Sequence, residues 1–394
     1  RYASTLRCLY GLRVARDQAK ITHERVVAFG DHGLIGNSWM NLMHFKPFLL
    51  KPDGYMGSYD SVRYHYGLAD RPDRMMVLDL YENVRMNGTS SDFGYLYEAQ
   101  RQAQEWGNTK LLYSTYWFTQ QAYANLGIVD STIYYNDLME VLASRYSKGE
   151  TRLNGTRNMA FAHDRAGKID EALVYYQEAF EKNNRYEVFS DQSGLLRAVG
   201  YAHLRSSNFE LAINNFVQTL EFAERLDEEF DEHSTKLMLA NLYNFTKEYE
   251  TSEKLCHEVV LWSETALSGP IQNHFKGSVT NTLGKVYKEK GYDDEALDYF
   301  AESTEYNKEN PAYTIVNDND IMDLFLKRDK LIAADSMYRK INEQYPDDFL
   351  LQNPTFQFLK GQLLVRQGNN RDGVKALQLN IAMAQGNGYN EEGM

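Results

Sequence analysis

Residues 282–300 read TLGKVYKEKGYDDEALDYF, and this stretch determines the fold class. Apolar residues recur at spacings of three and four on both sides of Gly291, which predicts two amphipathic helices separated by a turn. Gly291 suits the left-handed position that follows the end of a helix. Asp293 and Asp294 favour the first turn of the next helix, where the helix dipole attracts negative charge. The stretch therefore predicts a helical hairpin.

The same order of residues recurs along the chain. Numbered from the start of the first helix of each hairpin, the order has a small residue at position 8 and glycine or a polar residue near position 15. Alanine follows at position 20, an aromatic residue at position 24 and a small residue near position 27. Residues 158–179 and 199–216 are earlier copies. Counted from the first helix of each hairpin, the units start near Tyr113, Leu153, Ser193, His233, Gly277, Ile315 and Pro354. The pattern resembles the tetratricopeptide repeat (TPR) family.

The resemblance implies an all-α fold, a right-handed superhelix (α-solenoid) of TPR-like helix–turn–helix repeats of about 40 residues. Because the family repeat has about 34 residues, we expect the additional residues to lengthen the second helix of each hairpin and the turn between repeats. The order of residues favours TPR over HEAT or armadillo repeats, which share the longer period. Small residues at positions 8 and 20 allow close helix contact, so Gly284 is predicted to pack against Ala296.

The array is predicted to occupy residues 111–394 and to be truncated at the C-terminus, because the chain stops where another hairpin is due. Residues 1–110 are predicted to be a divergent N-terminal helical region of degenerate repeats, with a separate small domain as the alternative. Within it, residues 12–29 and 74–86 have helical patterns. Residues 30–33 and 51–54 are predicted turns, since glycine and proline punctuate them.

Composition excludes several classes of protein. The net charge of −13 opposes binding of polyanions, so no nucleic-acid partner is expected for this segment. No apolar run approaches the roughly 18 residues of a membrane span, so no membrane insertion is expected. Cys8 and Cys256 are far apart and have no ligand spacing. They are compatible with a cytoplasmic or a bacterial periplasmic location, between which the sequence does not decide.

No motif for catalysis is found, and the chain is predicted not to be an enzyme and to need no cofactor or metal. The glycine-rich residues 30–36 lack the Lys-Ser/Thr ending of a phosphate-binding loop. His163 and His203 share position 11 of successive units. Equivalent helices lie about 10 Å apart, which is too far for joint ligation, so both are predicted to pack.

In TPR proteins, positions 2, 5, 9, 12 and 13 of the first helix commonly face the concave groove. Arginine occupies positions 5 and 13 in two adjacent units, with an aromatic residue at position 9 between them. Guanidinium groups suit carboxylate or phosphate recognition. The alternative is that each arginine pairs with a nearby carboxylate, such as Asp164. The predicted ligand-binding residues are Arg157, Phe161, Arg165, Arg197, Tyr201, Arg205 and Asn241.

These observations predict a protein- or peptide-binding TPR scaffold, the interaction or sensing part of a larger regulatory protein. Bacterial signalling regulators often carry such arrays next to a kinase or DNA-binding domain, and this chain is similar. The partner is expected to be a protein or peptide that is acidic or has a free carboxylate. One alternative is a small-ligand or signal-peptide sensor with a deep groove. A remote alternative is an enzyme on a helical-repeat frame.

Overall fold

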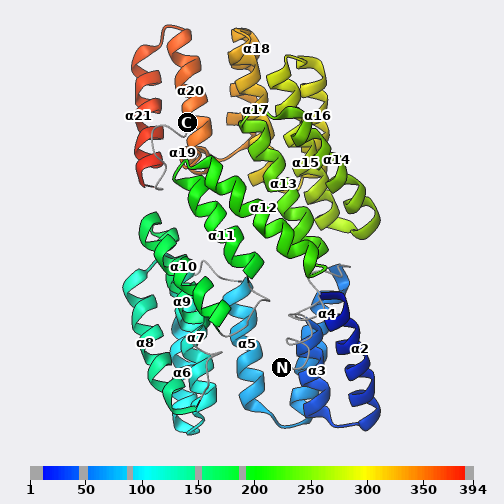
Figure 1. Cartoon of the computed structure of the whole chain (residues 1–394). Coiled ribbons are helices and arrows are strands. Elements are labelled where there is room, and N and C mark those ends of the chain that lie inside the picture. The colour runs from blue at the N-terminus through cyan, green and yellow to red at the C-terminus, as the bar shows by residue number, and fades with distance from the viewer. Residues whose placement is uncertain (1–11, 44–51, 87–91, 147–152, 186–191, 387–394) are drawn as a thin grey trace. The chain divides into compact units, whose positions relative to one another are not determined.

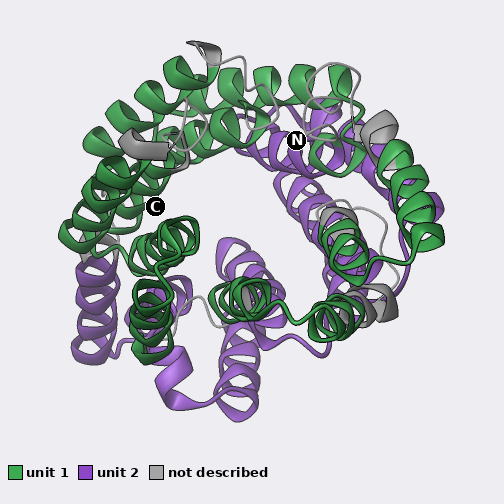
Figure 2. Ribbon diagram, turned by 90° about the horizontal axis from the view of Figure 1, so that it is seen from below, with its two compact units in different colours: residues 1–232 green, residues 233–394 purple. Residues whose placement is uncertain are grey.

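The computed structural model describes residues 12–43, 52–86, 92–146, 153–185 and 192–386 (Figure 1). Within these ranges the chain forms helices and turns, without a strand. It divides into two compact units, residues 1–232 and 233–394, which are coloured separately in Figure 2. The all-α class and the helical-repeat solenoid predicted from the sequence are confirmed, while the predicted boundary near residue 110 falls inside unit 1.

The helices follow one another as antiparallel pairs. Unit 1 contains α2 (Leu12–Phe29), α3 (His32–Met43), α4 (Pro52–Leu68), α5 (Pro72–Met86), α6 (Gly94–Glu105), α7 (Thr109–Asn125), α8 (Val129–Tyr146), α9 (Leu153–Arg165), α10 (Ile169–Arg185), α11 (Gln192–Arg205) and α12 (Phe209–Arg225). The division between the units falls within α13 (Glu229–Phe245). Unit 2 continues with α14 (Tyr249–Ala266), α15 (Gly269–Lys290), α16 (Asp293–Tyr306), α17 (Pro311–Lys327), α18 (Leu331–Gln344), α19 (Asp347–Leu351), α20 (Pro354–Arg366) and α21 (Asn370–Gly386).

Left-handed turn residues confirm the predicted register. The fifteenth residue of every predicted unit has a positive φ angle, and these residues are Gly127, Gly167, Ser207, Lys247, Gly291, Asp329 and Gly368. At Gly291, for example, φ is 88°, and the backbone N–H of Tyr292 donates to the carbonyl of Tyr287 at 2.9 Å. This bond satisfies a carbonyl that the ending helix leaves unpaired. Each predicted unit is therefore one hairpin.

Positions 8 and 20 lie in the core of each hairpin. At position 8 the buried residues are Gln120, Ala160, Gly200, Ala240, Gly284, Met322 and Gly361. At position 20 they are Thr132, Ala172, Ala212, Ser252, Ala296, Ala334 and Gly373. Most of these side chains are small because two helix backbones approach closely there, where larger side chains would overpack the contact. The close helix contact predicted from the repeat pattern is thus present in each hairpin.

The residue nearest to Gly284 is one that the prediction did not name. A Cβ atom at Gly284 would lie 2.6 Å from the ring of Phe300, at position 24, and Ala296 is not among its nearest neighbours. Gly200 and Phe216 repeat this arrangement, with the nearest ring atoms at 3.0 Å. The aromatic ring of the second helix therefore fills the space that the missing side chain leaves on the first.

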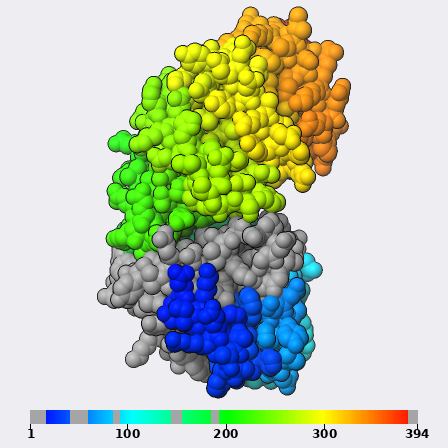
Figure 3. Space-filling view, turned by 90° about the vertical axis from the view of Figure 1, so that its right-hand side faces the viewer, coloured from blue at the N-terminus to red at the C-terminus, as the bar shows by residue number. Residues whose placement is uncertain are grey.

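Hydrogen bonds also join successive repeats. The Arg328 guanidinium donates to the Lys288 carbonyl at 2.9 Å and to the Asp293 carboxylate at 2.9 Å. One repeat later, Arg366 donates to the Leu326 carbonyl. Both carbonyls lie in the last turn of a first helix and also accept a backbone N–H, from Gly291 at 3.2 Å and from Asp329 at 3.1 Å. Figure 3 shows the surface of unit 2 in successive bands from yellow-green to orange, as expected when each hairpin covers the next stretch of surface.

The lengthening of the second helices is only part of the reason for the long period. Helices α8, α10, α12 and α14 have 17 or 18 residues, whereas α16 and α18 have 14. In the α15–α16 hairpin the first helix is the longer one, with 22 residues, and begins with Pro270 in its first turn. The extra residues are therefore distributed differently from one repeat to the next.

In the N-terminal region, α2 has the predicted bounds and α5 includes residues 74–86. The predicted turn at residues 30–33 is shorter than expected, because α3 already begins at His32. The predicted turn at residues 51–54 is wrong, because α4 begins at Pro52. Proline is tolerated in the first turn of a helix, since it lacks only an N–H that would be unpaired there.

Candidate functional site

The predicted arginine residues lie on two first helices of unit 1. Arg157, Phe161 and Arg165 follow one another at four-residue spacing on α9, so they share one face of that helix. Arg157 and Arg165 are exposed, and the guanidinium carbon of Arg165 lies 5.1 Å from the centre of the Phe161 ring. This stacking holds a positive charge at the surface while the ring remains half-buried.

On α11 the arginines are engaged by carboxylates. Arg197 forms an ion pair with Asp231 at 2.5 Å, and Arg205 pairs with Asp164 of α9. Burial raises the pKa of Asp164, although the Arg205 guanidinium opposes this effect. An anionic ligand would therefore have to compete with two internal carboxylates for these arginines. The pairing with Asp164 is the alternative that the sequence had left open.

The aromatic residues between these arginines are half-buried. Tyr201 packs edge-on against Phe216, with ring centres 5.3 Å apart, and burial raises its pKa. The buried Tyr176 hydroxyl donates to Asp164 at 3.5 Å. Together with the ion pairs, these contacts give α9 and α11 a connected polar layer. We refer to Arg157, Phe161, Arg165, Arg197, Tyr201 and Arg205 as the arginine face.

The last predicted residue, Asn241, lies in unit 2, where it lines a cavity of about 290 Å³ between α13, α15, α16 and α17. Residues at groove positions 2, 5 and 9 take part in the lining: Leu237, Asn241, Ser278, Asn281 and Val316. Asn241 accepts from the Thr282 hydroxyl at 3.1 Å. The groove positions of this unit therefore border open space. We call this space the amide cavity.

One wall of the amide cavity is a hydrogen-bonded polar network. The Asn281 amide donates to Asn317 at 2.8 Å and to Asp320 at 3.0 Å. Lys288 is almost fully buried, yet its ammonium group bonds to Asp323 at 2.8 Å and to Asp320 at 3.4 Å. Buried charges are stable only when they are paired in this way. The network holds the amide groups in defined orientations.

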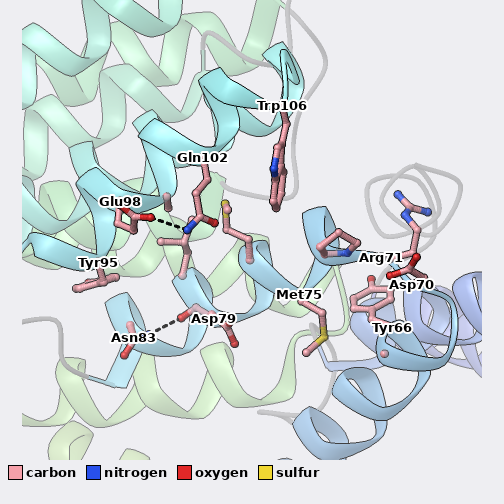
Figure 4. Close-up of a pocket in the computed structure, with 15 residues that line it drawn as sticks. Tyr66, Asp70, Arg71, Met75, Asp79, Asn83, Tyr95, Glu98, Gln102 and Trp106 are labelled. Carbon is pink, nitrogen blue, oxygen red and sulfur yellow. Dashed lines mark hydrogen bonds between the residues drawn. The ribbon is translucent and has the colours of Figure 1, made fainter.

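A larger cavity lies in unit 1, in the region where sequence patterns were weakest. It measures about 590 Å³ and is enclosed by the end of α4, by α5 and by α6 (Figure 4). Its lining includes Tyr66, Met75, Tyr95 and Trp106 together with carboxylates and amides. The repeat register did not extend to these helices, so no position number identified the lining residues. We call this space the α5–α6 pocket.

His163 packs against an aromatic side chain. Its ring lies 5.1 Å from that of Tyr175, and burial lowers its pKa. Among the residues that the structure describes, no three His, Cys, Asp or Glu side chains are arranged to hold a metal ion. In the same ranges, no helix is both long enough and apolar enough to cross a membrane.

No protein-family model and no curated protein matches the chain. Solved structures do resemble it. Apo RapI has a TM-score of 0.61 and 14% identity, with 89% of this chain and 96% of RapI covered. A Rap protein complexed with competence and sporulation factor has a TM-score of 0.56 and 11% identity, covering 94% of this chain and 99% of the Rap protein.

The apo quorum sensor NprR from B. thuringiensis has a TM-score of 0.52 and 11% identity, covering 79% of this chain and 98% of NprR. NprR has also been solved in complex with its cognate peptide NprX, with a TM-score of 0.53 and 11% identity. At such low identity the likeness concerns the fold. Together with the seven predicted hairpins and their core positions, it shows that this chain has a TPR-like helical-repeat fold.

Proposed function

We propose that the chain is a peptide-binding scaffold that serves as the interaction part of a larger regulatory protein. The observation that carries this proposal is the amide cavity, where the groove positions contribute two carboxamides and a hydroxyl group beside apolar side chains. Such groups can both donate and accept, as peptide main-chain groups require.

The size of the amide cavity favours part of a peptide over an enclosed small molecule. Pockets that bury a drug-sized ligand usually measure about 300–1,000 Å³, and this one is about 290 Å³. A peptide can place one side chain there and continue along the helices. The Rap protein and NprR were each solved with the factor or peptide named above, and their likeness to this chain supports the same type of ligand here.

The arginine face, which lies in unit 1, is proposed as a separate site, for an acidic side chain or a terminal carboxylate. Arg157 and Arg165 are the exposed members, whereas Arg197 and Arg205 are half-buried. We therefore assign first contact with an anion to Arg157 and Arg165. Phe161 and Tyr201 would pack against apolar parts of the same peptide.

The test is a screen of acidic and neutral peptides at two salt concentrations. An acidic peptide bound at the arginine face is expected to lose affinity as salt rises, because exposed charges are screened. Arg165→Ala should weaken that peptide, whereas Arg225→Ala should not. Arg225 is a matched control, since it is exposed on the second helix α12 and its guanidinium also stacks on a phenylalanine ring, 4.3 Å from Phe222.

The amide cavity is tested separately with Asn241→Ala. This variant should weaken acidic and neutral peptides alike and leave the salt dependence unchanged, because an amide contributes hydrogen bonds without net charge. If no peptide in the screen binds the wild-type chain, the proposed function is wrong. If peptides bind and Asn241→Ala has no effect, the proposal for the amide cavity is wrong.

A further inference from the structure

The α5–α6 pocket combines a deep apolar surface with an excess of negative charge. Leu80 and Ala99 are buried at its base, and Met75 and Met76 line its wall. Trp106 follows the C-terminal end of α6 and points toward α5 (Figure 4), with about half of its surface exposed at 47%. Unbranched thioethers adapt to side chains of different shape, so this surface suits an inserted apolar group.

The charges at the pocket are arranged around shared arginines. Arg63 bonds to Asp79 at 2.6 Å and also to Glu82 at 3.0 Å. Because one guanidinium group neutralises only one of the two carboxylates, one negative charge remains unbalanced.

The opposite wall has the same arrangement. Arg101 bonds to Glu98 of the lining and also to Glu105. Arg71, the one arginine among the described lining residues, donates two bonds of 2.9 Å to Asp73, and Asp73 also lies 3.8 Å from Nε of Arg74. The two shared ion pairs leave two carboxylate charges unbalanced, and Arg74, which shares Asp73 with Arg71, offsets one of them. The pocket therefore keeps a net negative charge.

Asp70 adds a further negative charge at the rim. It occupies the turn between α4 and α5 with a φ of 48°, and its backbone N–H donates to the Gly67 carbonyl at 3.2 Å. Its side chain is exposed and has no hydrogen-bond or ion-pair partner among the described residues. Aspartate tolerates this left-handed conformation better than most residues. The backbone conformation of Asp70 thus keeps its carboxylate at the pocket, where the carboxylate oxygens are available to bind a cation.

We propose that the α5–α6 pocket binds a peptide segment in which an apolar side chain is adjacent to a lysine or arginine. The apolar side chain enters between Met75 and Trp106, and the cation lies within reach of Asp70 and of the face of the Trp106 indole. An acidic or phosphorylated segment is disfavoured by the surplus carboxylates. The inference rests on the proposed peptide-binding function and gives it a second specificity, for positive charge, separate from the arginine face.

The experiment measures binding of capped dipeptides to the full chain by titration calorimetry or ligand-observed NMR. The probes are acetyl-Phe-Lys-amide, acetyl-Phe-norleucine-amide and acetyl-Phe-Glu-amide, which share the ring and differ in charge. The lysine dipeptide is expected to bind most tightly. Asp70→Asn and Trp106→Ala should each weaken it roughly three- to tenfold, in keeping with a single charge or cation–π contact.

Asp70→Asn is suited to this test because asparagine also accepts a positive φ. Asp329→Asn is the matched control, since Asp329 has a φ of 54° in another interhelical turn and does not line the pocket. The inference is overturned if the glutamate dipeptide binds as tightly as the lysine dipeptide, or if both pocket variants bind like the wild type. It is also overturned if phenethylamine, a free amine, binds at least tenfold more tightly than the lysine dipeptide.

Failure of this inference and failure of the proposed function give different results. If the acidic and neutral peptides of the screen bind and the pocket variants change nothing, only the inference about the pocket is wrong. If the lysine dipeptide responds to Asp70→Asn and Asn241→Ala has no effect on any peptide, the pocket binds peptides and the proposed amide cavity does not.

Discussion

The α11–α12 hairpin of unit 1 and the α15–α16 hairpin of unit 2 have the same core and different inner faces. Both place glycine at position 8 against an aromatic ring at position 24. At positions 5, 9 and 13, however, the first has Arg197, Tyr201 and Arg205, and the second has Asn281, Lys285 and Glu289. Core positions face a neighbouring helix and must fit it. Groove positions contact neighbouring helices through side chains alone, as Arg197 contacts Asp231 and Asn281 contacts Asn317, so they can differ in charge and chemistry.

The largest expected effect comes from removing the aromatic ring of the shared core. Phe216 and Phe300 are both fully buried, so Phe216→Ala and Phe300→Ala should each lower the free energy of unfolding by about 3–5 kcal/mol. Urea unfolding followed by circular dichroism measures the change. A loss below about 1 kcal/mol at one position would show that the two hairpins do not share a core.

Replacing the core glycines by leucine should lower the free energy of unfolding by a smaller amount, which differs between the two hairpins. Gly284→Leu is expected to lower the free energy of unfolding by about 1–3 kcal/mol, because its Cβ alone would meet the Phe300 ring at 2.6 Å. Gly200→Leu should cost less, because the Phe216 ring is 3.0 Å away. The same urea experiment compares them. Equal stability of Gly284→Leu and the wild type would mean that the ring moves aside without cost.

Hydrogen bonds between successive repeats provide the next comparison, within unit 2. In unit 2, Arg328 joins successive repeats through the Lys288 carbonyl. Arg328→Met should lower the free energy of unfolding by about 0.5–1.5 kcal/mol, the usual contribution of such a hydrogen bond. Arg339→Met serves as control, since Arg339 is exposed and only pairs with Asp335 on its own helix. Identical losses for the two variants would contradict a linking role for Arg328.

The smallest expected effect is a dependence of stability on pH in the α9–α10 hairpin. Burial lowers the pKa of His163 from its usual value near 6.5, with Glu171 opposing and Lys168 reinforcing the shift. As the pH falls, the His163 imidazole is therefore protonated in the unfolded chain before it is protonated in the folded chain. The folded state consequently loses stability below about pH 6.5. Urea unfolding midpoints at pH 7.5 and 5.5 should differ less in His163→Tyr than in the wild type. Tyrosine is chosen because Tyr243 and Tyr287 occupy the same position in other repeats. An unchanged difference would show that His163 does not contribute.

The register of the hairpins could be predicted because it depends on local rules. Gly167 and Gly291 mark turns through backbone freedom, and Ala172 and Ala296 mark close helix contacts through size. The contact of Gly284 with Phe300 was not predicted, because the repeat pattern indicates a small residue at position 8 but does not indicate which side chain packs against it. The start of α4 at Pro52 was missed because proline is compatible with both a turn and a first helical turn.

The candidate site was only partly predictable. The arginine spacing of four residues indicated a shared helix face, but the ion pair of Arg197 with Asp231 joins residues 34 apart in sequence. The α5–α6 pocket had no sequence signal at all, because Tyr66, Met75 and Trp106 come from three segments outside the repeat register. Such sites arise from packing between segments, and no short pattern encodes them.

The sequence by itself determined the helical-repeat class, the positions of the hairpins and their cores, because helix periodicity, turn residues and side-chain size act over a few residues. Only the tertiary structure decided which carboxylates engage the arginines, which amides border an open cavity and where a pocket forms between α5 and α6. These features depend on the distance between helices that are tens of residues apart in the chain. That distance is determined by the packing of whole side chains, which no single repeat unit specifies.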